Sequence, residues 1–169
     1  MKFSKRDLAG LSNGHLVFHD EPSFDENDLK EYPRIRKVLS VKADGKGEYD
    51  VSDGHLYLNL KITGEIVVPC DVTWDDVILP YDIDEDVELV FGNSDDPDVY
   101  PVNSNVLDTD PVVLRLIYQD IPLKVVRDGI LDYPKGDGWE VIREEDYVRS
   151  KENKTDPRME KLKELNTKN

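Results

Sequence analysis

Apolar and polar residues alternate along the segment from His55 to Val68. The apolar residues occupy even positions, namely Leu56, Leu58, Leu60, Ile62, Ile66 and Val68. Because successive side chains of a strand point to opposite faces, this pattern predicts a half-buried strand with its even face inward. Gly64 interrupts the alternation, so we expect a bulge or a bend there.

A second alternating series follows on odd positions, namely Val77, Leu79, Tyr81, Ile83, Val87, Leu89 and Phe91. An acidic group lies within it, made of Asp82, Asp84, Glu85 and Asp86. We expect these carboxylates at a bend or on the wet face. Two such ribbons separated by turn residues predict an antiparallel sheet with one side in water.

The N-terminal third gives weaker signals. Ser4 is a predicted cap of a short helix that ends at Gly10 or Gly14, and residues 16–18 predict a strand. Residues 20–33 are acidic and contain two prolines, which predicts a loop with one helical turn. Residues 34–43 predict a strand that leads to a turn at 44–47, where the sequence reads Asp-Gly-Lys-Gly.

Two helices are predicted after the sheet. Residues 92–110 form a polar, acidic stretch that we expect to be a loop. Asp110 and Pro111 then give a helix start, with proline where its missing N–H is tolerated. The apolar residues that follow have helical spacing and run from Val112 to Ile121, where Pro122 ends the helix. The same start recurs at Asp156-Pro157, followed by the apolar seam Met159, Leu162 and Leu165.

These elements predict one α+β domain over residues 1–150 and a C-terminal basic helical tail over 151–169. The domain would hold an antiparallel, partly barrel-like sheet, built from about residues 35–91, with one packed helix. A chain of 169 residues is long enough to bury a core without disulfide bonds.

The net charge of −15 is unevenly distributed. Residues 71–146 contain 21 acidic and 5 basic residues, a net charge of −16. Such a segment repels phosphate, which argues against a broad nucleic-acid interface and favours a basic protein partner. Alternatively, the acidic surface only keeps the protein soluble. The tail carries Lys151, Lys154, Arg158, Lys161 and Lys163. These basic residues alternate with acidic ones, so they either contact RNA or form an ordinary ion-paired helix.

Catalytic chemistry has little support in the sequence. The single cysteine, Cys70, is expected to be a small buried hydrophobe, and one cysteine excludes a multi-cysteine zinc site. His15 and His19 would share a strand face too far apart to hold one ion together, and His55 is expected on an outward face. No phosphate loop or metalloprotease motif occurs. We therefore expect no cofactor, no metal, no small-molecule substrate and no enzymatic activity.

No secretion signal or membrane-spanning run is recognisable, so we expect a cytoplasmic protein with no membrane partner.

The run from Gly64 to Cys70, followed by Thr73, resembles the strand-and-cysteine motif of the bacterial YceD family. Residues 79–91 resemble the strand pair that follows it in the family. The resemblance continues in order through the acidic loop, the helix from Asp110, and the later signature residues. The signature residues, which are also candidates for interaction, are Gly64, Cys70, Pro122, Gly138, Trp139, Asp156, Pro157, Arg158 and Lys161.

The YceD family is named for large ribosomal RNA subunit accumulation. The resemblance implies a non-catalytic accessory factor in ribosome assembly, whose partner is a large-subunit precursor or a basic ribosomal protein. RNA contact through the tail, a processing enzyme, and an adaptor for a basic partner unrelated to ribosomes remain alternatives. The chain departs from the family at Val72, where many members are basic, and lacks their cysteine cluster between Val125 and Trp139. We expect packing around Tyr133 and Trp139 to replace that cluster, with Trp139 in the core rather than exposed.

Overall fold

The structure is a computed structural model that describes residues 1–129 and 133–152. The chain divides into two compact units, Met1–Arg127 and Asp128–Asn169. The strands of the first unit are β1 (Lys2–Ser4), β2 (His15–Asp20), β3 (Lys37–Asp50), β4 (His55–Pro69), β5 (Asp76–Phe91), β6 (Val99–Val102) and β7 (Val106–Asp108). Its helices are α1 (Lys5–Ala9) and α2 (Asp110–Asp120), with short 3₁₀ helices η1 (Ser12–Gly14) and η2 (Asp28–Glu31).

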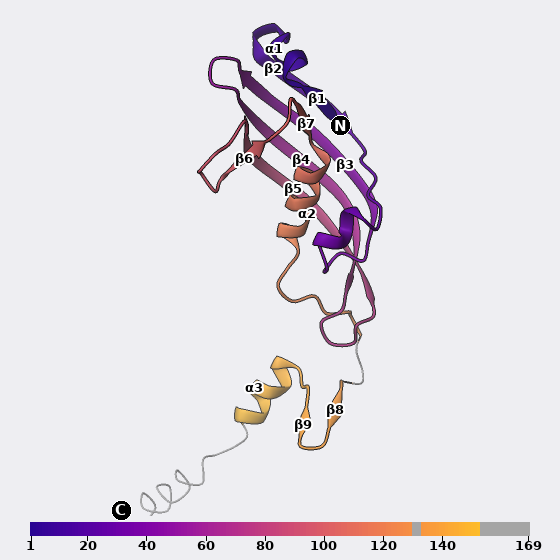
Figure 1. The fold of residues 1–169 in the computed structure, drawn as a ribbon. Coiled ribbons are helices and arrows are strands. Elements are labelled where there is room, and N and C mark those ends of the chain that lie inside the picture. Colours follow the sequence, from indigo (N-terminus) through magenta and orange to yellow (C-terminus); the bar gives the residue numbers. More distant parts are fainter. Residues whose placement is uncertain (130–132, 153–169) are drawn as a thin grey trace, which may run out of the picture. The chain divides into compact units, whose positions relative to one another are not determined.

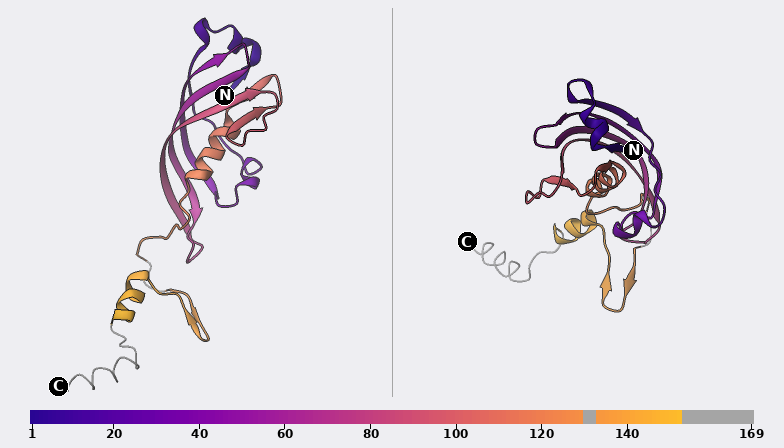
Figure 2. Two further views of the ribbon diagram at one scale, coloured as in Figure 1. Left: turned by 90° about the vertical axis from the view of Figure 1, so that its left-hand side faces the viewer. Right: turned by 45° about the horizontal axis from the view of Figure 1, so that its top comes forward.

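Five strands form the main sheet in the order β2-β3-β4-β5-β6, and β1 pairs with β7 in a separate ribbon. Neighbours are antiparallel except β5 and β6, which run parallel. The sheet curves around α2, as the right-hand view of Figure 2 shows, and the long strands β3, β4 and β5 are clearest in Figure 1. The predicted α+β class is confirmed. The sheet does not close into a barrel, because β2 and β6 are its two edges in the described part of the chain.

The predicted alternation of β4 is confirmed. Its even-numbered side chains from Leu56 to Val68 are buried, apart from the position of Gly64, and face α2 as part of one apolar core. The odd-numbered residues of β5 lie on the same side, so the core is a layer between the concave face and the helix. Burial of one full face on both strands explains why the sequence shows period two so clearly.

The predicted turn at residues 44–47 is wrong, because β3 runs through it and the turn lies at residues 51–54. The two glycines serve close packing instead. A Cβ atom on Gly45 would lie 2.1 Å from the Phe18 ring, and one on Gly47 would lie 2.0 Å from the Tyr57 carbonyl oxygen. Glycine is therefore required here by neighbours on adjacent strands.

Gly64 of β4 is likewise required by close packing against neighbouring strands. The predicted irregularity exists, but the register shift lies in β3, between Val38 and Ser40. A Cβ atom on Gly64 would lie 2.0 Å from the Ser40 carbonyl oxygen and 2.5 Å from the Tyr81 hydroxyl oxygen. The bulge of β3 thus approaches β4 where only a glycine fits.

Smaller differences concern the elements around the sheet. The acidic residues near Asp84 lie within one continuous strand, so the strand pair expected at 79–91 is the single strand β5. The expected loop at 92–110 contains β6 and β7. The helix α2 forms as predicted and ends before Pro122, although its N-cap residue is Thr109 rather than Asp110.

The second unit has a small hairpin of β8 (Lys135–Gly136) and β9 (Trp139–Glu140), followed by α3 (Glu144–Glu152). Gly138 has φ of 81° at the second position of the two-residue turn, a backbone conformation that glycine adopts without strain. The expected core position of Trp139 is wrong, since its exposed fraction is 57%. Tyr133 contacts Arg143, whose guanidinium donates to the Tyr133 hydroxyl at 3.1 Å.

Candidate functional site

Two signature residues of the first unit, Cys70 and Pro122, lie in neighbouring segments at the C-terminal end of β4. The loop 70–75 after β4 and the segment 122–127 after α2 bind each other, and we call these two segments the clasp. The Val125 N–H donates to the Asp71 carboxylate at 2.6 Å, and the Asp71 N–H donates to the Val125 carbonyl at 2.8 Å. Pro122 and Cys70 therefore lie in neighbouring segments that are far apart in sequence.

Three arginines fix the clasp. Arg34 donates to the Pro122 carbonyl at 2.8 Å and lies 3.7 Å from the Asp71 carboxylate. Arg127 pairs with the Asp75 carboxylate at 3.0 Å. The third, Arg36, pairs with the Asp76 carboxylate and donates to the Trp74 carbonyl at 2.7 Å. Sequence reasoning missed these residues because isolated arginines in an acidic chain give no local signal of their partners.

The Cys70 side chain is 0% exposed, as expected for a buried cysteine. Burial acts to raise the pKa of its thiol. Hydrogen bonds from the Thr73 hydroxyl and from backbone N–H groups, including that of Arg127 at 3.4 Å, outweigh this effect and lower it to about 7. The histidines that could activate a nucleophile bond carboxylates elsewhere, on the outer sheet face. Cys70 is thus placed to hold the clasp together through its sulfur.

One residue of the clasp points away from the core. Trp74 has φ of 62° and an exposed fraction of 72%. A bulky residue in the left-handed region is strained, and surrounding contacts must hold it there. The Trp74 N–H donates a hydrogen bond to the Cys70 carbonyl at 2.9 Å, and the Arg36 guanidinium donates one to the Trp74 carbonyl. Leu123, with an exposed fraction of 96%, is a second apolar side chain that the clasp presents to solvent.

The outer face of β5 carries the acidic group that the sequence indicated. We define the acidic edge as Asp82, Asp84, Asp86 and Glu88, which share one parity on the outer face, whereas Glu85 has the parity of the core residues Ile83 and Val87. Asn59 of β4 donates to both Asp84 and Asp86 at 2.9 Å, which holds these two carboxylates side by side on the outer face. Repulsion between like charges remains, so the group favours cations or a basic surface.

The histidines lie along the same outer face. His15 pairs with Glu48 at 3.2 Å, and His55 pairs with Glu88 at 2.5 Å. A hydrogen bond to Asp44 at 2.8 Å raises the pKa of His19. The prediction that His15 and His19 are exposed polar residues is confirmed. In the described residues no group of three or more histidine, cysteine or carboxylate side chains is arranged to hold a metal ion.

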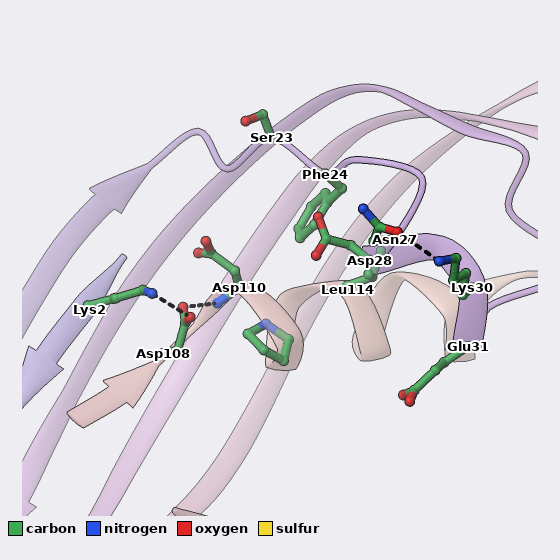
Figure 3. A pocket seen from close by; sticks show the side chains of 11 residues that line it. Lys2, Ser23, Phe24, Asn27, Asp28, Lys30, Glu31, Asp108, Asp110 and Leu114 are labelled. Carbon is green, nitrogen blue, oxygen red and sulfur yellow. Dashed lines mark hydrogen bonds and ion pairs between the residues drawn. The ribbon is translucent and has the colours of Figure 1, made fainter. Parts of the chain in front are cut away.

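A cavity of about 550 Å³ lies near the N-terminal end of α2. Figure 3 shows its lining charges, with Lys2 directed at Asp108 and Lys30 at Asn27. The first pair is separated by 3.3 Å and the second by 2.8 Å. Asp108 also accepts the Asp110 N–H at 3.2 Å. The two lysines thus have partners within the cavity wall, which leaves the acidic edge as the stronger candidate for binding.

The signature residues of the second unit are only partly described. Gly138 shapes the hairpin turn and Trp139 follows it in an exposed position. The predicted residues Asp156, Pro157, Arg158 and Lys161 lie outside the residues that the structure describes. The predicted division at residue 150 depends on that tail and stays a prediction. Of the described residues, no helix has both the length and the apolar character needed to cross a bilayer.

An open curved sheet, one covering helix and a row of carboxylates on the outer face of β5 define an α+β protein with an acidic surface. The chain belongs to the YceD family, whose model is described as large ribosomal RNA subunit accumulation protein YceD and matches residues 58–166. A curated relative is the uncharacterized protein YlbN of Bacillus subtilis (strain 168), with 30% identity over 138 residues. That match covers 78% of this chain and 77% of the relative. No solved structure gives a significant match.

The predicted family is therefore confirmed, and the family description gives the chain a ribosome-related role.

Proposed function

We propose that this protein is a cytoplasmic, non-catalytic accessory factor that supports the accumulation of large-subunit ribosomal RNA during ribosome assembly. The family match, which spans residues 58–166, is the observation that carries the proposal. It covers β5 with its acidic edge, the clasp and the second unit, so the candidate surfaces lie within the matched segment.

The acidic edge supports a protein partner rather than direct contact with RNA. Carboxylates such as Asp82 and Asp84 are exposed on one face and would repel a phosphate backbone. A basic ribosomal protein has the complementary charge, and electrostatic attraction accelerates the encounter of such partners. The protein would then act on the RNA indirectly, by delivering or holding a protein that the large subunit needs.

The test is cellular. Deleting the gene should lower large-subunit RNA relative to small-subunit RNA, and the wild-type gene should restore the ratio. Sedimentation of cell extracts should show the protein with precursors of the large subunit rather than with mature particles. Unchanged RNA ratios and subunit profiles in both slow and fast growth would contradict the proposed function.

The acidic edge also fits a second candidate, an adaptor that binds a basic partner unrelated to ribosomes. Isolation of the protein with its bound partner from cells separates the two. A ribosomal protein as the partner supports the first function. A different basic partner, combined with normal RNA ratios in the deletion strain, supports the second.

A further inference from the structure

One side of β5 is open over most of its length. β4 pairs with β5 from Asp76 to Val90, whereas β6 pairs only with Glu88–Phe91 on the other side. Within the described residues, positions 76–87 of β5 have no strand on that side. An open strand offers a row of N–H and C=O groups that another chain can bond.

Pro80 indicates which residues face the open side. It pairs with Glu65 of β4 without a register shift, and a proline in a ladder sits where its nitrogen faces away from the neighbouring strand. Backbone groups alternate in direction along an antiparallel strand. Asp82, Asp84 and Asp86 have the same parity as Pro80, so their N–H and C=O groups also face the open side.

A groove of about 490 Å³ runs beside this open strand. It lies between β5, the segment before β6, and α2. The lining residues that matter here are Ile83, Glu85, Tyr100, Leu116 and Asp120. The groove combines polar groups, among them the carboxylates of Glu85 and Asp120, with the largely buried apolar side chains of Ile83 and Leu116. Arg115 in its wall lies over the Tyr100 ring at 4.7 Å. A strand added to β5 would place every second side chain toward this groove.

We propose that the open strand of β5 binds a basic, extended peptide segment by strand addition. The segment bonds the outward backbone groups of β5 between Pro80 and Val87. Its lysine or arginine side chains lie beside Asp82, Asp84 and Asp86 on the outer face, and its alternate apolar side chains enter the groove. This is the mode in which main-chain hydrogen bonds give affinity and alternate side chains give specificity.

The charges have a simpler explanation, since acidic residues and a proline on an edge strand prevent unwanted pairing between copies of a protein. Both effects arise from the same residues. Repulsion excludes a second acidic edge, whereas a basic strand is attracted. The inference therefore depends on whether backbone pairing with a basic peptide occurs. It deepens the proposed function and rests on it only for the choice of a ribosomal protein as the source of the segment.

The probe is a synthetic peptide in which lysine and valine alternate over about eight residues, a common strand length. We expect the full-length protein to bind it in a fluorescence anisotropy titration, and binding should weaken as salt is raised. Two control peptides separate the contributions. One replaces lysine with glutamate, and the other keeps every charge but carries N-methyl groups on alternate backbone amides. Both should fail to bind, the second because its hydrogen bonds to β5 are blocked.

The matched protein variants change charge by the same amount at two places. The triple variant Asp82→Asn, Asp84→Asn, Asp86→Asn should weaken binding by about 3- to 100-fold, since each opposite-charge cross-strand pair contributes a factor of roughly 1.4 to 5. A control variant with Asp128→Asn, Asp137→Asn and Glu140→Gln, three exposed positions of the second unit, should bind as the wild type does. Thermal melts establish that both variants are folded.

Equal binding of the N-methylated peptide would overturn strand addition and leave only general charge attraction. If the wild type binds no basic peptide and the triple variant self-associates, the charges serve only to prevent pairing between copies of the protein. Either result leaves the RNA ratio of the deletion strain unaffected, so failure of this inference is distinguishable from failure of the proposed function. RNA binding at this edge, tested with a single-stranded oligonucleotide, would also contradict the inference.

Discussion

Replacing Gly64 with alanine tests whether the bulge of β3 requires glycine on β4. The added Cβ atom would lie 2.0 Å from the Ser40 carbonyl oxygen and 2.5 Å from the Tyr81 hydroxyl oxygen. Ordinary contact begins at 3.4 Å, so the Ser40 carbonyl would have to move by about 1.4 Å. Strands are separated by only about 4.7–4.9 Å, so this displacement cannot be absorbed without damage to the ladder.

The expected cost has two parts. Overpacking of a closely packed site costs about 1–3 kcal/mol. The Tyr81 hydroxyl donates to the Ser40 carbonyl at 2.8 Å, and burial raises the pKa of Tyr81, which keeps this donor protonated. Loss of one or two such hydrogen bonds adds about 1–2 kcal/mol, so the total loss is about 2–5 kcal/mol. At roughly 2–4 °C per kcal/mol, the melting temperature should fall by about 4–20 °C.

Urea denaturation followed by circular dichroism measures the effect. Gly10→Ala is the matched control, because a Cβ atom there would meet its nearest neighbour at 3.4 Å and its φ of −84° suits any residue. Tyr81→Phe removes one of the two clashing oxygens, so the loss in the double variant should be smaller than the sum of the single losses. A free energy of unfolding for Gly64→Ala within about 0.5 kcal/mol of the wild type, the usual range for surface substitutions, would refute the reasoning.

Four further outcomes are expected. Leu58→Asp should unfold the first unit in thermal melts because it buries a charge, whereas Tyr57→Asp, on the opposite face, should have a small effect; equal losses would contradict the assignment of faces. Elemental analysis should find no stoichiometric zinc, and a chelator should leave the melting temperature unchanged. NMR titration should give His19 a pKa above 6.5, and the pKa should return toward this value in the Asp44→Asn variant. The stability that the His19–Asp44 pair provides is present below about pH 6.5 and is lost as the pH rises through the raised pKa. Truncation of residues 151–169 should leave the melting temperature of the first unit unchanged but impair restoration of ribosomal RNA levels in the deletion strain.

The sequence predicted best those elements whose burial is imposed along one strand or helix. β4 shows period two because its even side chains all enter one core, and α2 shows helical spacing for the same reason. These two elements were sufficient for the α+β class. The parallel pairing of β6 with β5 was not predicted, because a strand of four residues carries too little pattern to reveal its partner.

The predictions were wrong where the residue type at a position is determined by its contacts in the fold and not by its neighbours in the sequence. Gly45 and Gly47 have the composition of a turn, but the Phe18 ring and the Tyr57 carbonyl require them inside β3. Trp139 was expected in the core because tryptophan usually is buried, yet the small hairpin that carries it leaves it exposed. Local composition cannot distinguish a glycine in a turn from a glycine in a strand, or a buried tryptophan from an exposed one, because it does not show which residues lie beside them in the fold.

The same reasoning separates the residues that identify the family from those that perform its function. Gly64 leaves room for the bulge of β3. The Cys70 sulfur accepts a hydrogen bond from the Arg127 N–H within the clasp, and the Pro122 carbonyl accepts one from the Arg34 guanidinium. Each of these signature residues of the first unit is occupied by contacts that hold the fold, and substituting them would change function through stability. The acidic edge has exposed carboxylates whose neutralisation removes no core contact. Variants at Asp82, Asp84 and Asp86 therefore test binding without confounding it with folding, and a loss of ribosomal RNA in such folded variants would place the partner on β5.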